Sequence, residues 1–163
     1  MRIYVLIFFV AALFLNSCEN KSDQIEPNAF FIDKSEDFLV FGHVYGSCTG
    51  DCRDLYLLVD NELYADSNDD VPWRNTSFNL TPLTYQDYVL SEPLEMVPDL
   101  IVDGRFQEDD LLQYIADFDI YIYGKRNGNE FEMIFDAIDL NAHASIKAYA
   151  LSVQQVTDEL KKR

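Results

Sequence analysis

Three cysteines, Cys18, Cys48 and Cys52, have the most definite chemistry in this sequence. Cys18 ends the segment Leu15-Asn16-Ser17-Cys18, and polar residues follow it at once. A thiol at such a place can carry a thioether-linked diacylglycerol, and a small residue before it suits the peptidase that cleaves there. Cys48 and Cys52 lie in a glycine-rich segment and can form a disulfide, a redox-active dithiol or part of a metal site.

The residues in front of Cys18 have the pattern of an export signal. Arg2 supplies one positive charge, and an unbroken apolar run covers residues 3–15. This run is too short for a transmembrane helix, which needs about 20 apolar residues, but it is typical of a secretory signal. We expect residues 1–17 to be removed and lipid on Cys18 to hold the protein at the bacterial cell envelope, on the periplasmic or surface face of the outer membrane. The alternatives are an ordinary signal peptide with a chance cysteine and an uncleaved anchor.

In an oxidising compartment, the pair Cys48 and Cys52 is most simply a disulfide. Such a short loop contributes about 2 kcal/mol in the chain-entropy model, so the bridge would shape a turn rather than hold the fold together. A redox-active dithiol is the first alternative, although three residues separate the thiols and no helix pattern follows them. A zinc site is the second, and its further ligands could come only from His43 and His143, the two histidines of the chain.

Residues 38–66 resemble a segment of small uncharacterised lipoproteins from Bacteroides-like bacteria. In that pattern an aromatic-glycine strand, here Phe41-Gly42, leads into Gly-x-Cys-x-Gly-x-Cys, here residues 46–52, and a tyrosine-containing strand with a short hairpin follows. The resemblance implies a secreted lipoprotein. It covers under a fifth of the chain and transfers no catalytic residue.

Size and charge restrict the fold and its partners. Removal of the signal would leave 146 of the 163 residues, enough for one domain with one core, and 48% hydrophobic residues exclude intrinsic disorder. The net charge of −17 repels phosphate backbones, so we expect no nucleic-acid partner. It would also repel anionic lipid headgroups, which leaves membrane attachment to the lipid on Cys18.

Periodicity and turn signals predict an α+β fold: one domain with an antiparallel sheet packed against a C-terminal amphipathic helix and short central helices. Alternating or continuous apolar runs predict strands over residues 38–45, 54–60, 62–65, 77–80, 120–123 and 130–135, with turns at Asp60-Asn61 and Asn127-Gly128. A capping box at Thr84 begins one helix and Pro93 the next, residues 107–116 are an ambiguous helical stretch, and residues 145–162 form the last helix. Residues 18–36 are expected to be a lipidated flexible tether, and the globular domain to span residues 37–163.

A low-ranking candidate for a binding face is formed by His43, Tyr45, Tyr121 and Tyr123, because outward-facing tyrosines suit glycan or protein ligands. The competing reading is buried tyrosines within a sheet and a structural histidine. The segment 66–70 begins like a calcium loop, but Val71 and Ser77 stand where glycine and glutamate are needed, which favours a solvated acidic loop. We therefore expect no metal, no cofactor and no catalytic residue that sequence alone can name.

The sequence contains no serine-nucleophile motif, phosphate-binding loop or HExxH motif. This favours a non-enzymatic binding or interaction domain, with an envelope protein or a glycan as ligand. The alternatives are a hydrolase-like envelope enzyme that uses clustered carboxylates and a thiol redox protein that uses Cys48 and Cys52. A deep pocket with two convergent acids would favour the enzyme, and a flat aromatic patch would favour the binding domain.

Overall fold

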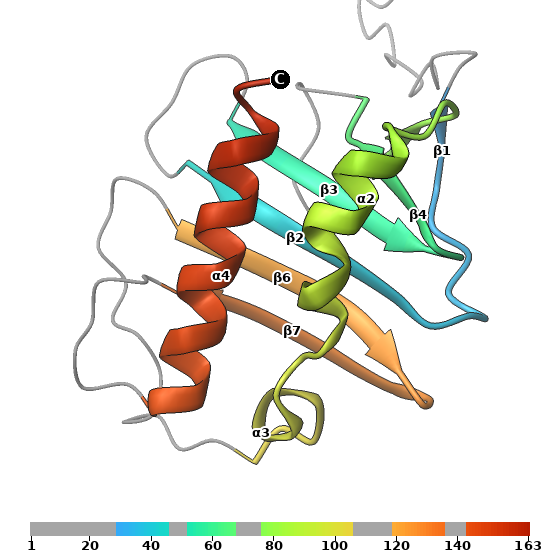
Figure 1. The fold of residues 1–163 in the computed structure, drawn as a ribbon. Helices are drawn as coiled ribbons and strands as arrows, with labels where there is room; N and C mark the ends of the chain where they lie inside the picture. The colour runs from blue at the N-terminus through green and yellow to red at the C-terminus, as the bar shows by residue number, and fades with distance from the viewer. Residues whose placement is uncertain (1–28, 46–51, 68–75, 106–118, 136–142) are drawn as a thin grey trace, which may run out of the picture.

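Five antiparallel strands in the order β4-β3-β2-β6-β7 form the main sheet of the described residues (Figure 1). The computed structural model describes residues 29–45, 52–67, 76–105, 119–135 and 143–163. In chain order the strands are β2 (Phe38–Val44), β3 (Arg53–Val59), β4 (Glu62–Ala65), β6 (Asp119–Arg126) and β7 (Asn129–Phe135). The predicted α+β fold with an antiparallel sheet is confirmed.

Two two-residue turns set the register of the outer hairpins. Asp60 and Asn61 have φ of 53° and 61°, and Asn127 and Gly128 have φ of 53° and 84°. Two successive residues with positive φ match the right-handed twist of the flanking strands, and this is why Asn-Gly and Asp-Asn sequences are selected here. Both predicted turns are confirmed, and β4 has the predicted bounds.

The helices cover one face of the main sheet (Figure 1). Helix α2 (Tyr85–Ser91) begins at the predicted capping box, in which the side chains of Thr84 and Asp87 each accept a hydrogen bond from the other's backbone N–H. The 3₁₀ helix η2 (Glu92–Glu95) follows directly, with Pro93 in its first turn as predicted. The short helix α3 (Asp99–Val102) was not predicted.

The C-terminal helix α4 (Ala144–Leu160) lies across β2 and β6. Its buried apolar residues recur at helical spacing, as predicted, and they are Ile146, Tyr149, Ala150, Val153, Val156 and Leu160. They pack on Leu39 and Phe41 of β2 and on Tyr56 and Leu58 of β3 to form the helix-side core. Alternate residues of the same strands, such as Val40 and Leu57, are buried on the opposite face. The sheet is therefore buried on both faces along its central strands.

The domain extends further towards the N-terminus than predicted. Strand β1 (Ala29–Phe30) pairs with β5 (Phe78–Asn79), and the ring of Phe30 lies 5.0 Å from that of Tyr64, centroid to centroid. The expected boundary between a tether ending at residue 36 and a domain starting at 37 is thus too late. A pair of two-residue strands is too short for a periodicity signal, so only its apolar residues could have indicated the contact.

Several predictions fall outside the described residues: the signal peptide of residues 1–17, the lipidated Cys18, and the helical stretch 107–116. No helix within the described ranges is long and apolar enough to cross a membrane.

Candidate functional site

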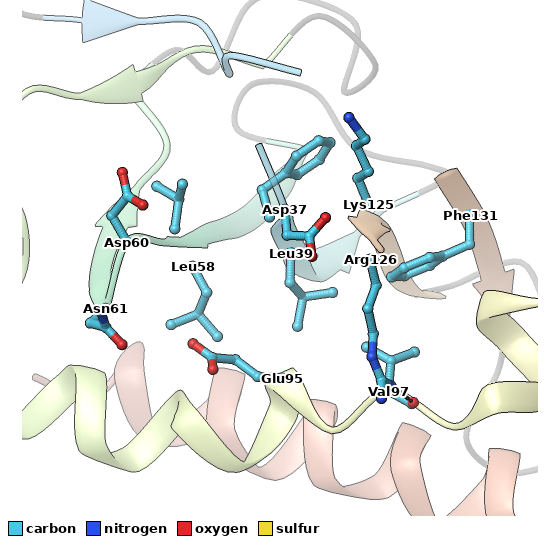
Figure 2. Close-up of a pocket in the computed structure, with 12 residues that line it drawn as sticks. Asp37, Leu39, Leu58, Asp60, Asn61, Glu95, Val97, Lys125, Arg126 and Phe131 are labelled. Atoms are coloured by element: carbon cyan, nitrogen blue, oxygen red, sulfur yellow. Dashed lines mark hydrogen bonds between the residues drawn. The ribbon is translucent and has the colours of Figure 1, made fainter. Parts of the chain in front are cut away.

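A pocket of about 310 Å³ lies at the end of the main sheet that holds both two-residue turns (Figure 2). Six of its twelve lining residues are apolar, five are charged and one is an amide; they are Asp37, Phe38, Leu39, Leu58, Val59, Asp60, Asn61, Glu95, Val97, Lys125, Arg126 and Phe131. Ligand pockets in proteins commonly have volumes of about 300–1,000 Å³. This pocket is therefore large enough for a small molecule or for one side chain of a larger partner.

Backbone carbonyl groups hold the two cations of the pocket in place. Lys125 Nζ donates hydrogen bonds to the carbonyl oxygens of Lys34 at 2.9 Å and of Ser35 at 3.1 Å. Arg126 Nη1 donates to the carbonyl oxygen of Val97 at 2.7 Å, and Figure 2 shows its guanidinium beside that residue. These contacts join the end of β6 to the segments before β2 and after η2, so they build the walls of the pocket.

Two other polar side chains of the pocket are also engaged in the fold. Asp37 Oδ2 accepts a hydrogen bond from the backbone N–H of Asn127 at 3.0 Å, which ties the start of β2 to the turn between β6 and β7. Asn61 Oδ1 accepts from the hydroxyl of Tyr88 at 3.3 Å, which ties the other turn to α2. The pocket is consequently preformed by contacts among its own walls.

The carboxylates of Asp60 and Glu95 differ from the rest of the polar lining. Within the described part of the chain, neither carboxylate has a hydrogen-bond or ion-pair partner. Partial burial, and then the nearby charge of Glu92, raise the pKa of Glu95 above its ordinary value. In Figure 2 the carboxylates of Asp60 and Glu95 point in different directions, with Leu58 between them. The site thus offers two separate acceptors beside an apolar floor.

A second polar cluster lies at the opposite end of β2, next to the cysteine segment. Lys161 Nζ donates to Asp54 Oδ2 at 2.6 Å and to the hydroxyl of Tyr45 at 2.8 Å, and this hydroxyl also donates to Asp54. Hydrogen bonds to these two partners raise the pKa of Lys161, while burial raises that of Tyr45. A protonated amine and a neutral phenol are poor nucleophiles. We therefore interpret the cluster as a structural contact that attaches the end of α4 to the sheet.

The four residues of the predicted binding face lie on two different faces of the sheet. His43 continues the row of Leu39 and Phe41 on the helix side, and its ring centroid is 6.4 Å from that of Tyr45. Tyr121 pairs with Gly42 and belongs to the opposite face, where its hydroxyl donates to Glu132 at 3.2 Å.

Tyr123 pairs with Val40 on that opposite face, packs edge-on against Phe38, and has Lys34 Nζ 5.0 Å above its ring. The prediction of one shared binding face is therefore wrong. The register of β2 and β6 pairs Tyr121 and Tyr123 with residues that face away from the helices, whereas His43 faces towards them. Tyr121 is buried, as the competing reading expected.

The cysteine segment joins β2 to β3. Cys52 is the first described residue after this segment, while Cys48 and the other residues of segment 46–51 lie outside the described ranges. The backbone N–H of Tyr45 donates to the carbonyl oxygen of Cys52 at 2.8 Å, so the two ends of the segment are held together. The specific pairing of Cys48 with Cys52 stays a prediction.

Two other sequence candidates have roles within the fold. Asp66, the first residue of the calcium-like segment, binds Arg53 through a 2.7 Å ion pair, and residues 68–75 lie outside the described ranges. No cluster suited to a metal ion occurs among the described residues. His143 lacked a partner in the sequence, but its Nδ1 accepts from the backbone N–H of Ser145 at 3.3 Å and caps α4.

Burial of His43 predicts a loss of stability in mild acid. The side chain is 2% exposed, and this desolvation lowers its pKa below 6.5, although the carboxylates of Asp158 and Asp54 oppose the shift and Lys161 adds to it. The unfolded chain then binds a proton more readily than the folded one. The contribution of the neutral His43 ring to the free energy of unfolding is therefore complete above about pH 6.5. It is lost as the pH falls towards the lower pKa of the folded state.

We therefore expect the free energy of unfolding, measured by urea denaturation from pH 7 to pH 5, to fall less steeply in His43→Phe than in the wild type. The difference in slope is at most about 1.4 kcal/mol per pH unit for one proton. His143→Asn serves as the control for loss of a histidine. Equal slopes in the wild type and His43→Phe would contradict the prediction.

Sequence reasoning missed the pocket, although one signal for it was present. Its walls come from four separate segments, near residues 37–39, 58–61, 95–97 and 125–131. Two antiparallel hairpins with short turns, one after β3 and one after β6, can bring these turns to one end of a sheet, as occurs here.

No family model matches this chain, and no curated protein matches it with significant sequence similarity.

Proposed function

We propose that this chain is a lipid-anchored protein of the bacterial cell envelope that binds a small ligand, or one side chain of an envelope partner, without catalysing a reaction. The preformed pocket at the end of the main sheet carries this proposal. Its wall residues are held by hydrogen bonds before any ligand arrives, so binding requires little ordering of the protein.

Lipid on Cys18 is the part of the proposal that concerns location, and it rests on the sequence before that residue and on the resemblance of residues 38–66. Two or more acyl chains on one residue are enough for stable anchoring. We expect wild-type protein in the membrane fraction and Cys18→Ala largely outside it. Equal membrane retention of the two forms would contradict the anchor. A disulfide between Cys48 and Cys52 belongs to the same proposal, and the mass of the unreduced protein and its peptides tests it.

Ligand binding is tested with the mature chain, residues 18–163 with Cys18→Ala, because every contact described above involves residues from Ala29 onwards. A set of small neutral, cationic and anionic compounds is titrated into the ¹⁵N-labelled protein, and amide shifts are mapped by NMR. We expect saturable shifts at Leu39, Leu58 and Phe131 for a subset of the compounds.

A bulky variant, Glu95→Trp, changes an exposed position at the pocket and should abolish those shifts while the rest of the spectrum is retained. Saturable binding that maps only elsewhere, or binding that is unchanged in Glu95→Trp, would contradict the pocket as the binding site.

A hydrolytic enzyme is the second candidate, favoured by the raised pKa of Glu95 in a pocket that also contains Asp60. A general acid with a raised pKa is what glycoside hydrolysis needs, but the partner carboxylate must face the same bond. The different directions of the two carboxylates favour binding over this reaction. Turnover of chromogenic glycosides that is lost in Glu95→Gln would reverse the order of the two candidates.

A further inference from the structure

Some polar side chains of the pocket have hydrogen-bond partners within the protein and others have none, and this difference determines which charge a ligand should carry. Lys125 donates to two backbone carbonyls and Arg126 to a third, so hydrogen bonds within the fold already hold both cations. Asp37 is likewise bound to a backbone N–H. Only Asp60 and Glu95, among the charged residues that line the pocket, have carboxylates without a partner in the described structure.

The floor between these groups is apolar. Leu39 and Leu58 are 4% and 2% exposed, and Val97 and Phe131 are buried beside them. A fully hydrated inorganic cation gains nothing from such a surface, whereas an alkyl or aryl group that lies against it is itself removed from water, at about 25 cal/mol per Å² of the ligand's buried apolar area. The ligand that matches both features has a positive charge and an apolar body.

We propose that the pocket binds an amphipathic organic cation: an ammonium group that pairs with the carboxylate of Glu95, carried on an aliphatic chain that lies along Leu58 and Leu39. This inference rests on the proposed binding function and names its ligand class. The net charge of −17 over the whole chain supports it, because the field of an acidic protein raises the local concentration of cations.

Three probes that share one alkyl chain separate the contributions of charge and apolar contact. Hexylammonium, hexanol and hexanoate are titrated separately into the ¹⁵N-labelled mature chain at low salt, and the shifts of pocket amides are fitted to dissociation constants. We expect hexylammonium to bind about fivefold more tightly than hexanol, which is the upper end for an ion pair at a partly exposed site. Hexanoate should bind more weakly than hexanol, and 0.5 M NaCl should remove most of the preference for the amine.

The matched variants are Glu95→Gln and Glu92→Gln. Both remove one negative charge from η2, but only Glu95 lines the pocket. Glu95→Gln should therefore lower hexylammonium affinity towards that of hexanol, whereas Glu92→Gln should change it less than twofold. Since both glutamates are exposed, neither variant is expected to impair folding.

The outcomes separate this inference from the proposed function. If hexanol or hexanoate binds the pocket as tightly as hexylammonium, the cation inference is overturned and the binding function stands. If Glu92→Gln weakens the amine as much as Glu95→Gln, the preference comes from overall charge, and the assigned contact is wrong. If no probe shifts the pocket amides, the inference is overturned, and the wider compound set described above decides the binding function separately.

Discussion

Alanine at Gly42 is expected to unfold the domain. A Cβ atom built on Gly42 would lie 1.9 Å from the carbonyl oxygen of Asp54, and the φ of this residue is +147°, a conformation that other residues rarely adopt. Gly42 pairs with Leu55 of β3 and with Tyr121 of β6, so neither neighbouring strand can retreat without loss of sheet hydrogen bonds. We expect a loss of more than about 4 kcal/mol, a large part of the roughly 5–15 kcal/mol that stabilises a domain.

Gly104→Ala is the control that separates steric clash from backbone strain. Its φ is +62°, but a Cβ atom there would meet nothing within 4 Å. The free energy of unfolding should therefore fall only by the cost of a left-handed backbone conformation in a residue with a Cβ atom, about 1–2 kcal/mol. Thermal and urea unfolding monitored by circular dichroism measure both variants. A Gly42→Ala protein as stable as Gly104→Ala would show that the close approach of β2 and β3 is not essential to the fold.

Truncation of Phe41 to alanine is expected to have the second-largest effect. Phe41 is 0% exposed at the middle of β2, and its ring stacks on that of Tyr56 at a centroid distance of 5.7 Å in the helix-side core. Removal of a buried phenyl ring loses its transfer free energy and leaves a cavity that neighbouring side chains fill only in part. The expected loss is about 3–5 kcal/mol, measured from the midpoint of urea unfolding with the slope unchanged.

Phe31→Ala makes the same chemical change at an exposed position. Phe31 follows β1 directly and is 53% exposed, so its removal should alter stability by no more than about 0.5 kcal/mol. Comparison of the two variants isolates the contribution of burial from that of side-chain chemistry. Similar losses in both would mean that α4 does not pack on β2 as described.

Local signals were sufficient for most of the elements. The positive φ of Asn127-Gly128, the capping box of Thr84 and the helical spacing of apolar residues in α4 each involve residues only a few positions apart. The free energy of such features depends little on the rest of the chain, so they can be recognised in a sequence. The same reasoning placed the strand of residues 62–65 correctly and put β2 and β3 within one residue of their bounds.

Pairing between distant segments depended on the folded domain. β2 lies between β3 and β6. The register of β2 and β6 places Tyr121 and Tyr123 on the face of the sheet that is opposite to the face of His43 and Tyr45. The pairing of β1 with β5 and the pocket between four segments have the same origin. Alternation reveals which residues of a strand share a face, but the neighbours of that strand are chosen by the burial of both faces against the whole core. For this reason the lipidation of Cys18 can be predicted from the few residues before it and stays a prediction, whereas the pocket that contains Glu95 forms only when the sheet and η2 have packed together.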